Sequence, residues 1–559
     1  MIAKRDNFRR IFYYQRKVMN EIQRRRTFAI ISHPDAGKTT LTEKLLLYGG
    51  AIHLAGSVTA RSNQRATTSD WLELEKKRGI SVSSTVLQFD YRNHCINLLD
   101  TPGHRDFSED TYRVLTAVDA VIMVIDAAKG IENQTLKLFE ICRLKHIPIF
   151  TFMNKLDRPT RDPLELIDEL ERVLGLHPFP MNWPLGNGPD FKGVYDRMSG
   201  QAHLFERTSG NAFRAPVTLH NPYDPILKKQ MNSMSYQKFA EDLEILEVAG
   251  ASLDRASILS GETTPVYFGS ASNNFGVQLL LTGFLSYSPP PSPRNTSSGL
   301  IPPEHPFFSG FIFKIQGNMD PRHRDRVAFL RICSGTFTRD MNVIHSRTGR
   351  RIRLANVHKV FGRDREIIDK AYPGDILGIT GHSGFAIGDT LSEDPGIVYD
   401  EIPRFPPECF AFLQNKNPSN FKAFWKGLNQ SITEGIVQFF SVDNTSQAAP
   451  LLAAVGPLQF EVLQYRLESE YGVESHLETA PWQLVRWLDS AEKENLSEKS
   501  LNLTSGVRLG KDAYGEPVAF FRSDWELRYF NERNPKISLY VLPGQDDISQ
   551  AVSLLGATA

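Results

Sequence analysis

The segment from Ser32 to Thr40 has the residue types and the spacing of a phosphate-binding loop. It matches the pattern G-x-x-x-x-G-K-[ST], except that Ser32 replaces the first glycine. Gly37 lets the backbone approach a phosphate closely, Lys38 can reach the β- and γ-phosphates, and the Thr39 hydroxyl can bind Mg²⁺. A chance Gly-Lys-Thr at a helix start is the alternative. The residues predicted to line the loop are Ser32, His33, Pro34, Asp35, Ala36, Gly37, Lys38, Thr39 and Thr40.

A second candidate is Asp100, which ends an apolar run and is followed by the turn Thr101, Pro102, Gly103 and His104. An acidic residue at the end of a buried strand can hold Mg²⁺ through a water molecule. The N–H group of Gly103 can donate to the terminal phosphate. An ordinary turn after a strand is the alternative, because Pro-Gly is common in turns.

A third candidate follows another apolar run and consists of Asn154, Lys155, Leu156 and Asp157. The Asp157 carboxylate can accept hydrogen bonds from N1–H and the 2-amino group of guanine, a pair of donors that adenine lacks. A buried polar match of this kind discriminates strongly, because the wrong base leaves a charge unpaired. The motif predicts GTP and GDP as ligands, with an N-capping loop as the alternative.

Two flanking segments complete the predicted nucleotide site. Ser57–Gly79 is polar and precedes Ser81. A polar loop that ends in a hydroxyl is typical of a switch that orders around the γ-phosphate and Mg²⁺, and a surface loop is the alternative. Ser270 and Ala271 follow a further apolar run and can contact the guanine O6 through the backbone. The predicted metal ligands are Thr39, Ser81 and Asp100.

These motifs need a common scaffold, and residues 27–290 predict one. Short apolar runs alternate there with helix-like stretches, which predicts a mostly parallel sheet covered on both faces. Such sheets bind ligands at the carboxyl ends of their strands, where all three motifs are expected. The conjunction predicts an α/β P-loop GTPase domain that binds GTP rather than ATP. The apolar runs are Phe28–Ser32, Cys95–Asp100, Ala120–Asp126, Pro148–Asn154 and Pro265–Ser270.

The rest of the chain changes pattern twice. From residue 305, short strands with regular turn signals predict an antiparallel β-barrel domain. From residue 396, helical stretches mixed with strands predict an α+β domain. The expected boundaries are 1–26 for a basic leader, 27–287 for the GTP-binding domain with an inserted subdomain near 176–250, 288–304 for an extended Pro/Ser linker, 305–395 for the barrel, 396–535 for the α+β domain and 536–559 for a C-terminal tail.

Composition narrows the class of protein. The 559 residues suffice for three or four domains of roughly 150 residues each. The four cysteines lie far apart, and no apolar run approaches the roughly 20 residues of a transmembrane helix, so we expect a cytoplasmic protein with no membrane partner. The balance of 64 basic and 64 acidic residues neither demands nor excludes a nucleic-acid partner. The basic leader is expected to be disordered or to precede the true start, with Met19 as an alternative to Met1.

Together these residues resemble the translational GTPases, and longer stretches resemble the family of bacterial peptide chain release factor 3, the class II release factors. This resemblance implies a ribosome-dependent GTPase that promotes the dissociation and recycling of class I release factors after peptide release. It implies that the protein is a monomer. Its implied partners are the ribosome, both ribosomal RNA and ribosomal proteins, and class I release factors. It runs from about Gln23 to Arg528 and is carried by Thr27–Thr40, Asn97–Tyr112, Phe152–Arg158, Phe191–Tyr195, Phe313–Gly335, Ala371–Leu377 and Ala454–Gln459.

The resemblance also implies catalytic roles for three residues. His104 would position the attacking water, Lys38 would neutralise phosphate charge together with Mg²⁺, and Asp35 would help to hold a monovalent cation. Ser32 and Ser81 depart from the wider superfamily but fit this subgroup. Two alternatives stay open: another translational GTPase, such as a translocation or recycling factor, and a non-hydrolysing GTP-sensing scaffold on the ribosome.

Overall fold

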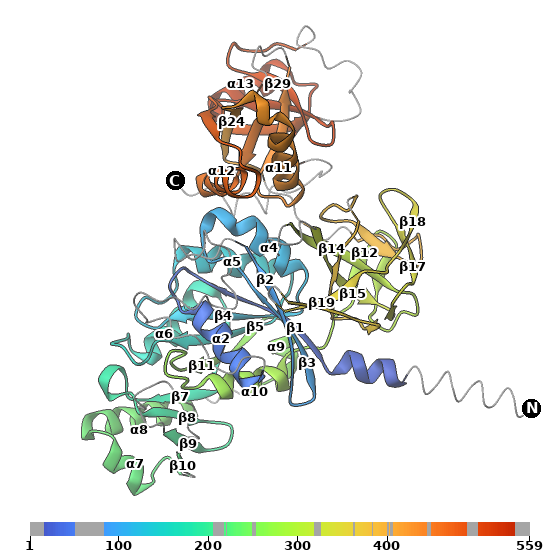
Figure 1. Ribbon diagram of the computed structural model, residues 1–559. Helices are drawn as coiled ribbons and strands as arrows, with labels where there is room; N and C mark the ends of the chain where they lie inside the picture. Colours follow the sequence, from blue (N-terminus) through green and yellow to red (C-terminus); the bar gives the residue numbers. More distant parts are fainter. Residues whose placement is uncertain are drawn as a thin grey trace, which may run out of the picture.

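The computed structural model describes residues 16–50, 83–204, 217–219, 221–248, 253–317, 326–361, 364–382, 384–399, 402, 406–443, 449–488 and 501–542. The chain forms an α/β domain, an antiparallel β-barrel domain and an α+β domain, in that order (Figure 1). The fold class predicted from the sequence is confirmed. No helix in these described ranges is both long and apolar enough to cross a membrane.

The α/β domain is built on a sheet with the strand order β2-β3-β1-β4-β5-β11-β6. All neighbouring pairs are parallel except β2 with β3, which are antiparallel. The carboxyl ends of β1, β3 and β5, which carry the three predicted motifs, therefore meet at one edge of the sheet. The strands are β1 (Arg25–Ser32), β2 (Thr85–Tyr91), β3 (His94–Asp100), β4 (Ala120–Asp126), β5 (Ile149–Asn154), β6 (His177–Pro180) and β11 (Thr263–Phe268).

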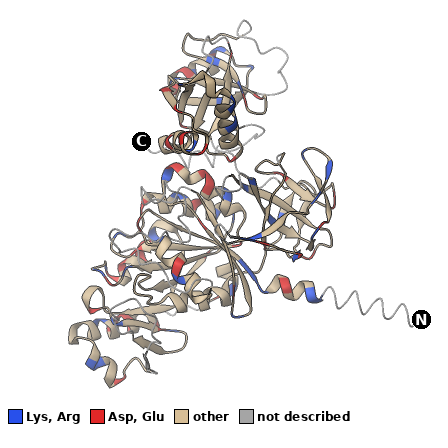
Figure 2. Cartoon of the chain, in the orientation of Figure 1, with Lys and Arg blue, Asp and Glu red and all other residues tan. Residues whose placement is uncertain are grey.

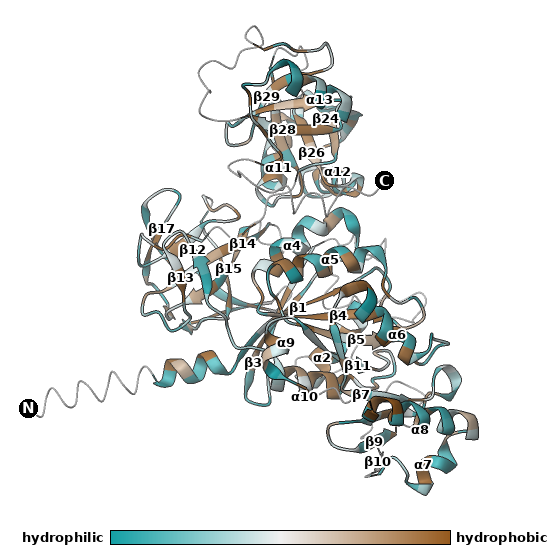
Figure 3. Cartoon of the chain, turned by 180° about the vertical axis from the view of Figure 1, so that it is seen from behind, coloured by the Kyte–Doolittle hydropathy of each residue, from teal (hydrophilic) through white to brown (hydrophobic). Residues whose placement is uncertain are grey.

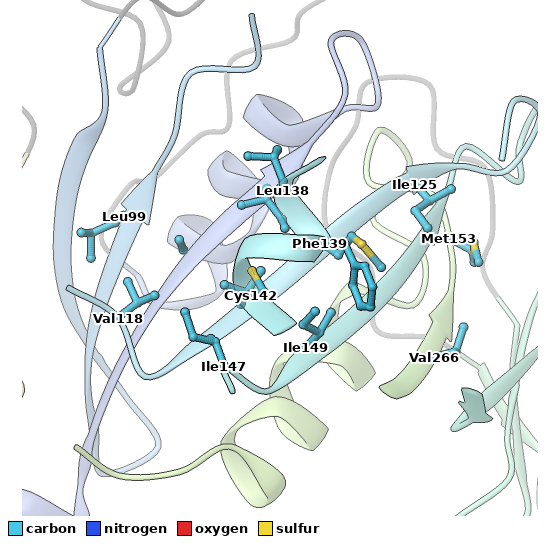
Figure 4. Close-up of a cluster of buried hydrophobic side chains, with 14 of the residues drawn as sticks. Leu99, Val118, Ile125, Leu138, Phe139, Cys142, Ile147, Ile149, Met153 and Val266 are labelled. Atoms are coloured by element: carbon cyan, nitrogen blue, oxygen red, sulfur yellow. The ribbon is translucent and has the colours of Figure 1, made fainter. Parts of the chain in front are cut away.

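Helices cover both faces of this sheet, which explains why its central strands are apolar throughout (Figure 3). One face carries α4 (Ser108–Thr116), α5 (Asn133–Leu144) and α6 (Pro163–Glu169). The other carries α2 (Lys38–Tyr48), α9 (Arg255–Leu259) and α10 (Val277–Tyr287). Figure 4 shows the first face, where α5 packs on the strands through Leu138, Phe139 and Cys142, among Leu99, Val118, Ile149 and Met153.

The inserted subdomain begins later than the sequence pattern predicts. The segment at its expected start forms β6, which pairs with β11 and so extends the central sheet. The separate small sheet begins only at Asn182, and it lies away from the other domains in Figure 1. Its elements are β7 (Asn182–Leu185), β8 (Gly193–Asp196), β9 (Gln201–Leu204), β10 (Val217–Leu219), α7 (Pro225–Gln230) and α8 (Ser233–Val248).

The predicted end of the leader at residue 26 is also wrong, because β1 already begins at Arg25. Residues 16–23 are helical, and Figure 2 shows basic and acidic residues together on this segment. Arg25 is buried and its Nε lies 2.9 Å from Asp375 Oδ2 in the barrel domain, while Glu21 Oε2 lies 2.7 Å from its Nη1. These charges anchor the start of the α/β domain.

The Pro/Ser segment does not act as a free spacer. Residues within it form the hairpin β12 (Arg294–Thr296) and β13 (Gly299–Ile301). Arg294 donates from Nη1 to the Thr116 carbonyl at 2.7 Å and from Nη2 to the Val118 carbonyl at 2.7 Å. The segment is thereby fixed on the α/β domain, since the guanidinium satisfies carbonyls at the end of α4.

The barrel domain is joined to the α/β domain by strand pairing and by a buried ion pair. Its strand β19 (Val357–Phe361) pairs with β2 where Phe361 faces Leu87, so one hydrogen-bonded sheet runs through both domains. Arg331 Nη2 lies 2.5 Å from Asp119 Oδ2, and both side chains are only 1% exposed. The main barrel strands are β14 (Ser309–Gly317), β15 (Arg326–Ser334), β17 (Asn342–His345), β18 (Arg350–Arg353), β22 (Ile376–Ile379) and β23 (Thr390–Ser392).

In its described residues, the third domain consists of an antiparallel sheet and helices that pack on it. Its strand order is β27-β24-β26-β25-β29-β30-β28-β31. Helices α11 (Phe421–Thr433) and α12 (Pro457–Tyr471) pack together on this sheet, and α13 (Asp524–Arg533) packs on β30. The strands are β24 (Cys409–Asn415), β25 (Gln438–Val442), β26 (Leu451–Ala454), β27 (Ser475–Thr479), β28 (Leu484–Leu488), β29 (Arg508–Asp512), β30 (Pro517–Phe521) and β31 (Leu539–Tyr540).

Candidate nucleotide site

The predicted phosphate loop connects β1 to α2 as expected. Gly37 precedes α2 in a left-handed conformation with φ 97°, which a residue with a Cβ rarely adopts. A Cβ at this position would lie 2.3 Å from Asn154 Nδ2. Asp35 is exposed and also left-handed at φ 65°. The loop is therefore held in a strained cradle at a helix N-terminus, where backbone N–H groups favour anions.

His33 is buried inside the loop and fixes its shape. Its Nδ1 lies 2.5 Å from the Pro34 carbonyl and 2.6 Å from Glu132 Oε2. Both neighbours are acceptors, so the proton belongs on Nδ1. Burial lowers the pKa of His33 although Glu132 acts in the opposite direction. The ring is therefore neutral near pH 7, and it ties the loop to the segment before α5.

Lys38 and Asp100 come together at the edge of the sheet. Lys38 Nζ donates to Asp100 Oδ1 at 2.7 Å, and their side chains are 7% and 3% exposed. Thr101 Oγ1 donates to the Ile30 carbonyl at 2.7 Å, which fixes the turn after β3 against β1. A Cβ at Gly103 would lie 3.7 Å from Pro34 Cα, so this turn lies directly beside the phosphate loop.

Asn154 connects the phosphate loop to the predicted guanine loops. Its Nδ2 donates to the Ala36 carbonyl at 2.8 Å, and its Oδ1 accepts from the Ala271 N–H at 2.8 Å. The Leu156 N–H donates to the Gly269 carbonyl at 3.2 Å. Three loops that lie more than a hundred residues apart in the chain are therefore fixed to one another.

The predicted base-recognition residues also meet. Ser270 Oγ donates to Asp157 Oδ1 at 2.5 Å, so this serine orients the carboxylate with its side chain rather than its backbone alone. Lys155 is left-handed at φ 71° and its Nζ lies 2.8 Å from Asp126 Oδ2. Burial alone would raise the pKa of Asp126, but the hydrogen bonds from Lys155 and the Ala128 N–H, together with the positive charge of Lys155, outweigh burial and the pKa is lowered.

His104 lies at the start of the short helix η1 (Arg105–Phe107), which leads into α4. Its side chain is 36% exposed. Its Nδ1 accepts from the Asp106 N–H at 3.3 Å and lies 3.4 Å from Asp106 Oδ1. The ring is thus held through one nitrogen, which leaves Nε2 as the nitrogen that can contact a water molecule.

Two residues of this site escaped the sequence analysis. Asp126 ends an apolar run, as Asp100 does. Its position at the end of that run is the sequence feature that could have identified it as a site residue. Glu132 lies in a loop, and no motif points to its contact with His33. Ser81 and the expected switch segment Ser57–Gly79 lie outside the described residues.

The arrangement fits a nucleoside triphosphate with Mg²⁺. The glycine cradle and the start of α2 fit phosphates, Lys38 and Asp100 lie within hydrogen-bond distance of each other, and Asp157 is oriented by Ser270. Among the described residues, no group of three or more His, Cys, Asp or Glu side chains is placed to hold a metal.

Comparisons with known proteins agree with this geometry. The family model "Elongation factor Tu GTP binding domain" matches residues 23–290 and "Elongation factor G domain 2" matches residues 307–394. "Class II release factor RF3, C-terminal domain" matches residues 399–531. A solved structure from Thermus thermophilus shares the fold with a TM-score of 0.66 and 23% identity, covering 87% of this chain and 72% of that one.

Curated relatives extend the likeness over the whole length. Peptide chain release factor 3 of Gloeothece citriformis (strain PCC 7424) is 54% identical over 526 residues, which are 94% of this chain and 97% of the relative. The same factor of Synechococcus elongatus is 52% identical over 545 residues, which are 97% and 98% of the two chains. Identity of this extent, together with the class II domain at the C-terminus, shows that the chain belongs to the peptide chain release factor 3 family, GTPases of translation termination.

Proposed function

We propose that this chain is a ribosome-dependent GTPase that promotes the dissociation and recycling of class I release factors after peptide release. It acts as a monomer in the cytoplasm. The observation that carries the proposal is the contact between the third domain and the turn that holds His104 in the α/β domain. A class II release factor domain donates a hydrogen bond, from the Leu458 N–H, to Asp106 in the turn that holds His104.

The reaction is the transfer of a phosphoryl group from GTP to water, which yields GDP and phosphate. Its transition state needs positioning and charge neutralisation more than covalent chemistry. Lys38 binds oxygens of the β- and γ-phosphates, and the N–H groups of the loop from Ser32 to Thr40 bind the same anion. Gly103 donates its N–H to the γ-phosphate from the turn beside Pro34.

Thr39 and Ser81 would be the hydroxyl ligands of Mg²⁺, and Asp100 would hold it through a water molecule. Bound Mg²⁺ supplies positive charge to the β- and γ-phosphate oxygens. Asp35 is exposed and would help to hold a monovalent cation.

His104 orients the attacking water through Nε2, since Nδ1 is held by Asp106. The ring is partly exposed, so ribosomal RNA can reach it when the protein binds the ribosome. Asp157, oriented by Ser270, selects guanine over adenine. The backbone of Ser270 and Ala271 contacts the guanine O6.

A release assay tests this function. Ribosomes that have released their peptide and hold a fluorescent class I release factor are mixed with the full chain and GTP, GDP or neither. We expect faster dissociation of the labelled factor with GTP than without nucleotide, accompanied by phosphate formation. Binding of GTP without turnover would indicate the sensing scaffold instead. Turnover with no effect on the labelled factor would indicate another step of translation.

A further inference from the structure

The third domain contacts the α/β domain at the turn after His104. The Leu458 N–H at the start of α12 donates to Asp106 Oδ2 at 2.8 Å. Phe107 packs against Val462 of α12, with Leu458 and Ile436 beside them. Figure 1 shows α12 next to the α4 end of the α/β domain.

The two domains are so close at this contact that there is no room for an added side-chain atom. Gly456 is the residue before α12, and a Cβ on it would lie 2.2 Å from Asp106 Cγ and 2.6 Å from each carboxylate oxygen. Its backbone has φ −151°, an extended conformation that any residue can adopt. A Cβ at position 456 would therefore push the Asp106 carboxylate out of its present place, although the backbone itself would accept another residue.

Asp106 has a second set of contacts, to the ring of His104. The Asp106 N–H donates to His104 Nδ1 at 3.3 Å, and Asp106 Oδ1 lies 3.4 Å from the same nitrogen. The bond made by one ring nitrogen of histidine sets the proton on the other and the direction in which the ring points. The Asp106 side chain is only 11% exposed, so water does not compete freely for these contacts.

We infer that Asp106 is a positioning residue for His104 and that the third domain sets its position through the Leu458 N–H and the close approach of Gly456. The inference rests on the proposed role of His104 in hydrolysis. It adds that the catalytic geometry of the α/β domain depends on where the third domain is docked. Movement of α12 would displace Asp106 and, with it, His104 Nδ1.

The variant Gly456→Ala tests this coupling, because it places a methyl group against Asp106 from a different domain and leaves every nucleotide contact intact. Gly384→Ala is the matched control, since a Cβ there meets no described atom within 4 Å. Displacing a catalytic group by about 1 Å costs on the order of 100-fold in rate. We expect Gly456→Ala to lower single-turnover hydrolysis with saturating ribosomes at least tenfold, with GTP and GDP dissociation constants unchanged within twofold.

A double-variant cycle separates positioning from a general loss of structure. Asp106→Ala removes the group that the new methyl would meet, so adding Gly456→Ala to it should change the rate less than twofold further. Thermal unfolding of each variant checks that the domains stay folded. Gly456→Ala hydrolysing like Gly384→Ala, or faster, would overturn the inference, as would independent losses in the double variant. His104→Ala with normal hydrolysis would instead overturn the proposed role of His104 itself.

Discussion

Asn154 and Ala36 are joined by a hydrogen bond of 2.8 Å from the asparagine Nδ2 to the alanine carbonyl. The Oδ1 of the same amide accepts from the Ala271 N–H at 2.8 Å. One buried side chain therefore fixes the distance between the phosphate loop and a loop that contacts the base. The nucleotide site acts as one unit because its two ends cannot move independently of Asn154.

Replacing Asn154 by alanine should weaken GTP and GDP binding by similar factors. Two backbone groups, the Ala36 carbonyl and the Ala271 N–H, would lose their buried partner, at about 1–3 kcal/mol each. We expect an increase of about 30-fold or more in both dissociation constants, since about 1.4 kcal/mol corresponds to tenfold, measured by titration with fluorescent nucleotides. Asn295→Ala, on the exposed face of β12, is the control. A loss confined to GTP would contradict the argument, because the bonds do not involve the γ-phosphate.

Asp157→Asn should change which base is preferred. The carboxylate accepts from two guanine donors, whereas an amide offers one acceptor and one donor. Guanine then loses charge-assisted bonds of about 1.5–3 kcal/mol each. The affinity for xanthine nucleotides should increase, because the C2 carbonyl of xanthine can accept a hydrogen bond from the new amide. Ser270 can still donate to the amide oxygen, so the loop should keep its shape. Competition between GDP and XDP measures the outcome, and continued preference for GDP would show that another group reads the base.

The motifs of the α/β domain were predictable because each follows an apolar run that forms a parallel strand. Their contacts could not be predicted, since spacing alone does not show that Asn154 reaches Ala36 or that Glu132 reaches His33. The strand β6 was missed because it is short and pairs at the edge with a partner far away in sequence. The interface between the third domain and Asp106 was missed as well. A single glycine before a helix, here Gly456, does not indicate which residue of another domain packs against it.

A chain that starts at Met19 should fold and hydrolyse GTP as the full chain does. It keeps Glu21 and Arg25, and so keeps the ion pair of Arg25 with Asp375 in the barrel domain. A chain that starts at Thr27 lacks Arg25 and should unfold at a lower temperature. Calorimetry and ribosome-stimulated turnover of both truncated chains test this. Loss of turnover in the Met19 chain would instead make the basic leader an RNA contact.

Arg331→Met should loosen the barrel domain from the α/β domain. It leaves the buried Asp119 without its closest partner at 2.5 Å, and removing one member of a buried pair costs about 3–5 kcal/mol. Arg294, at 3.3 Å from Asp119, offsets part of this loss. Arg172→Met, from an exposed pair with Asp168, should change stability by less than about 1 kcal/mol. Equal unfolding temperatures for the two variants would contradict a structural role for Arg331.

The central claim is that this site hydrolyses GTP with His104 oriented on the ribosome. Single-turnover hydrolysis by wild-type chain and His104→Ala, with and without saturating 70S ribosomes, tests it most directly, together with equilibrium GTP and GDP binding. We expect slow hydrolysis by both chains alone, strong stimulation of the wild type, and loss of most of that stimulation in the variant. Nucleotide affinity should stay nearly unchanged, the pattern of an interaction made only in the transition state. A variant that binds GTP normally and hydrolyses it near the wild-type rate on ribosomes would contradict the account.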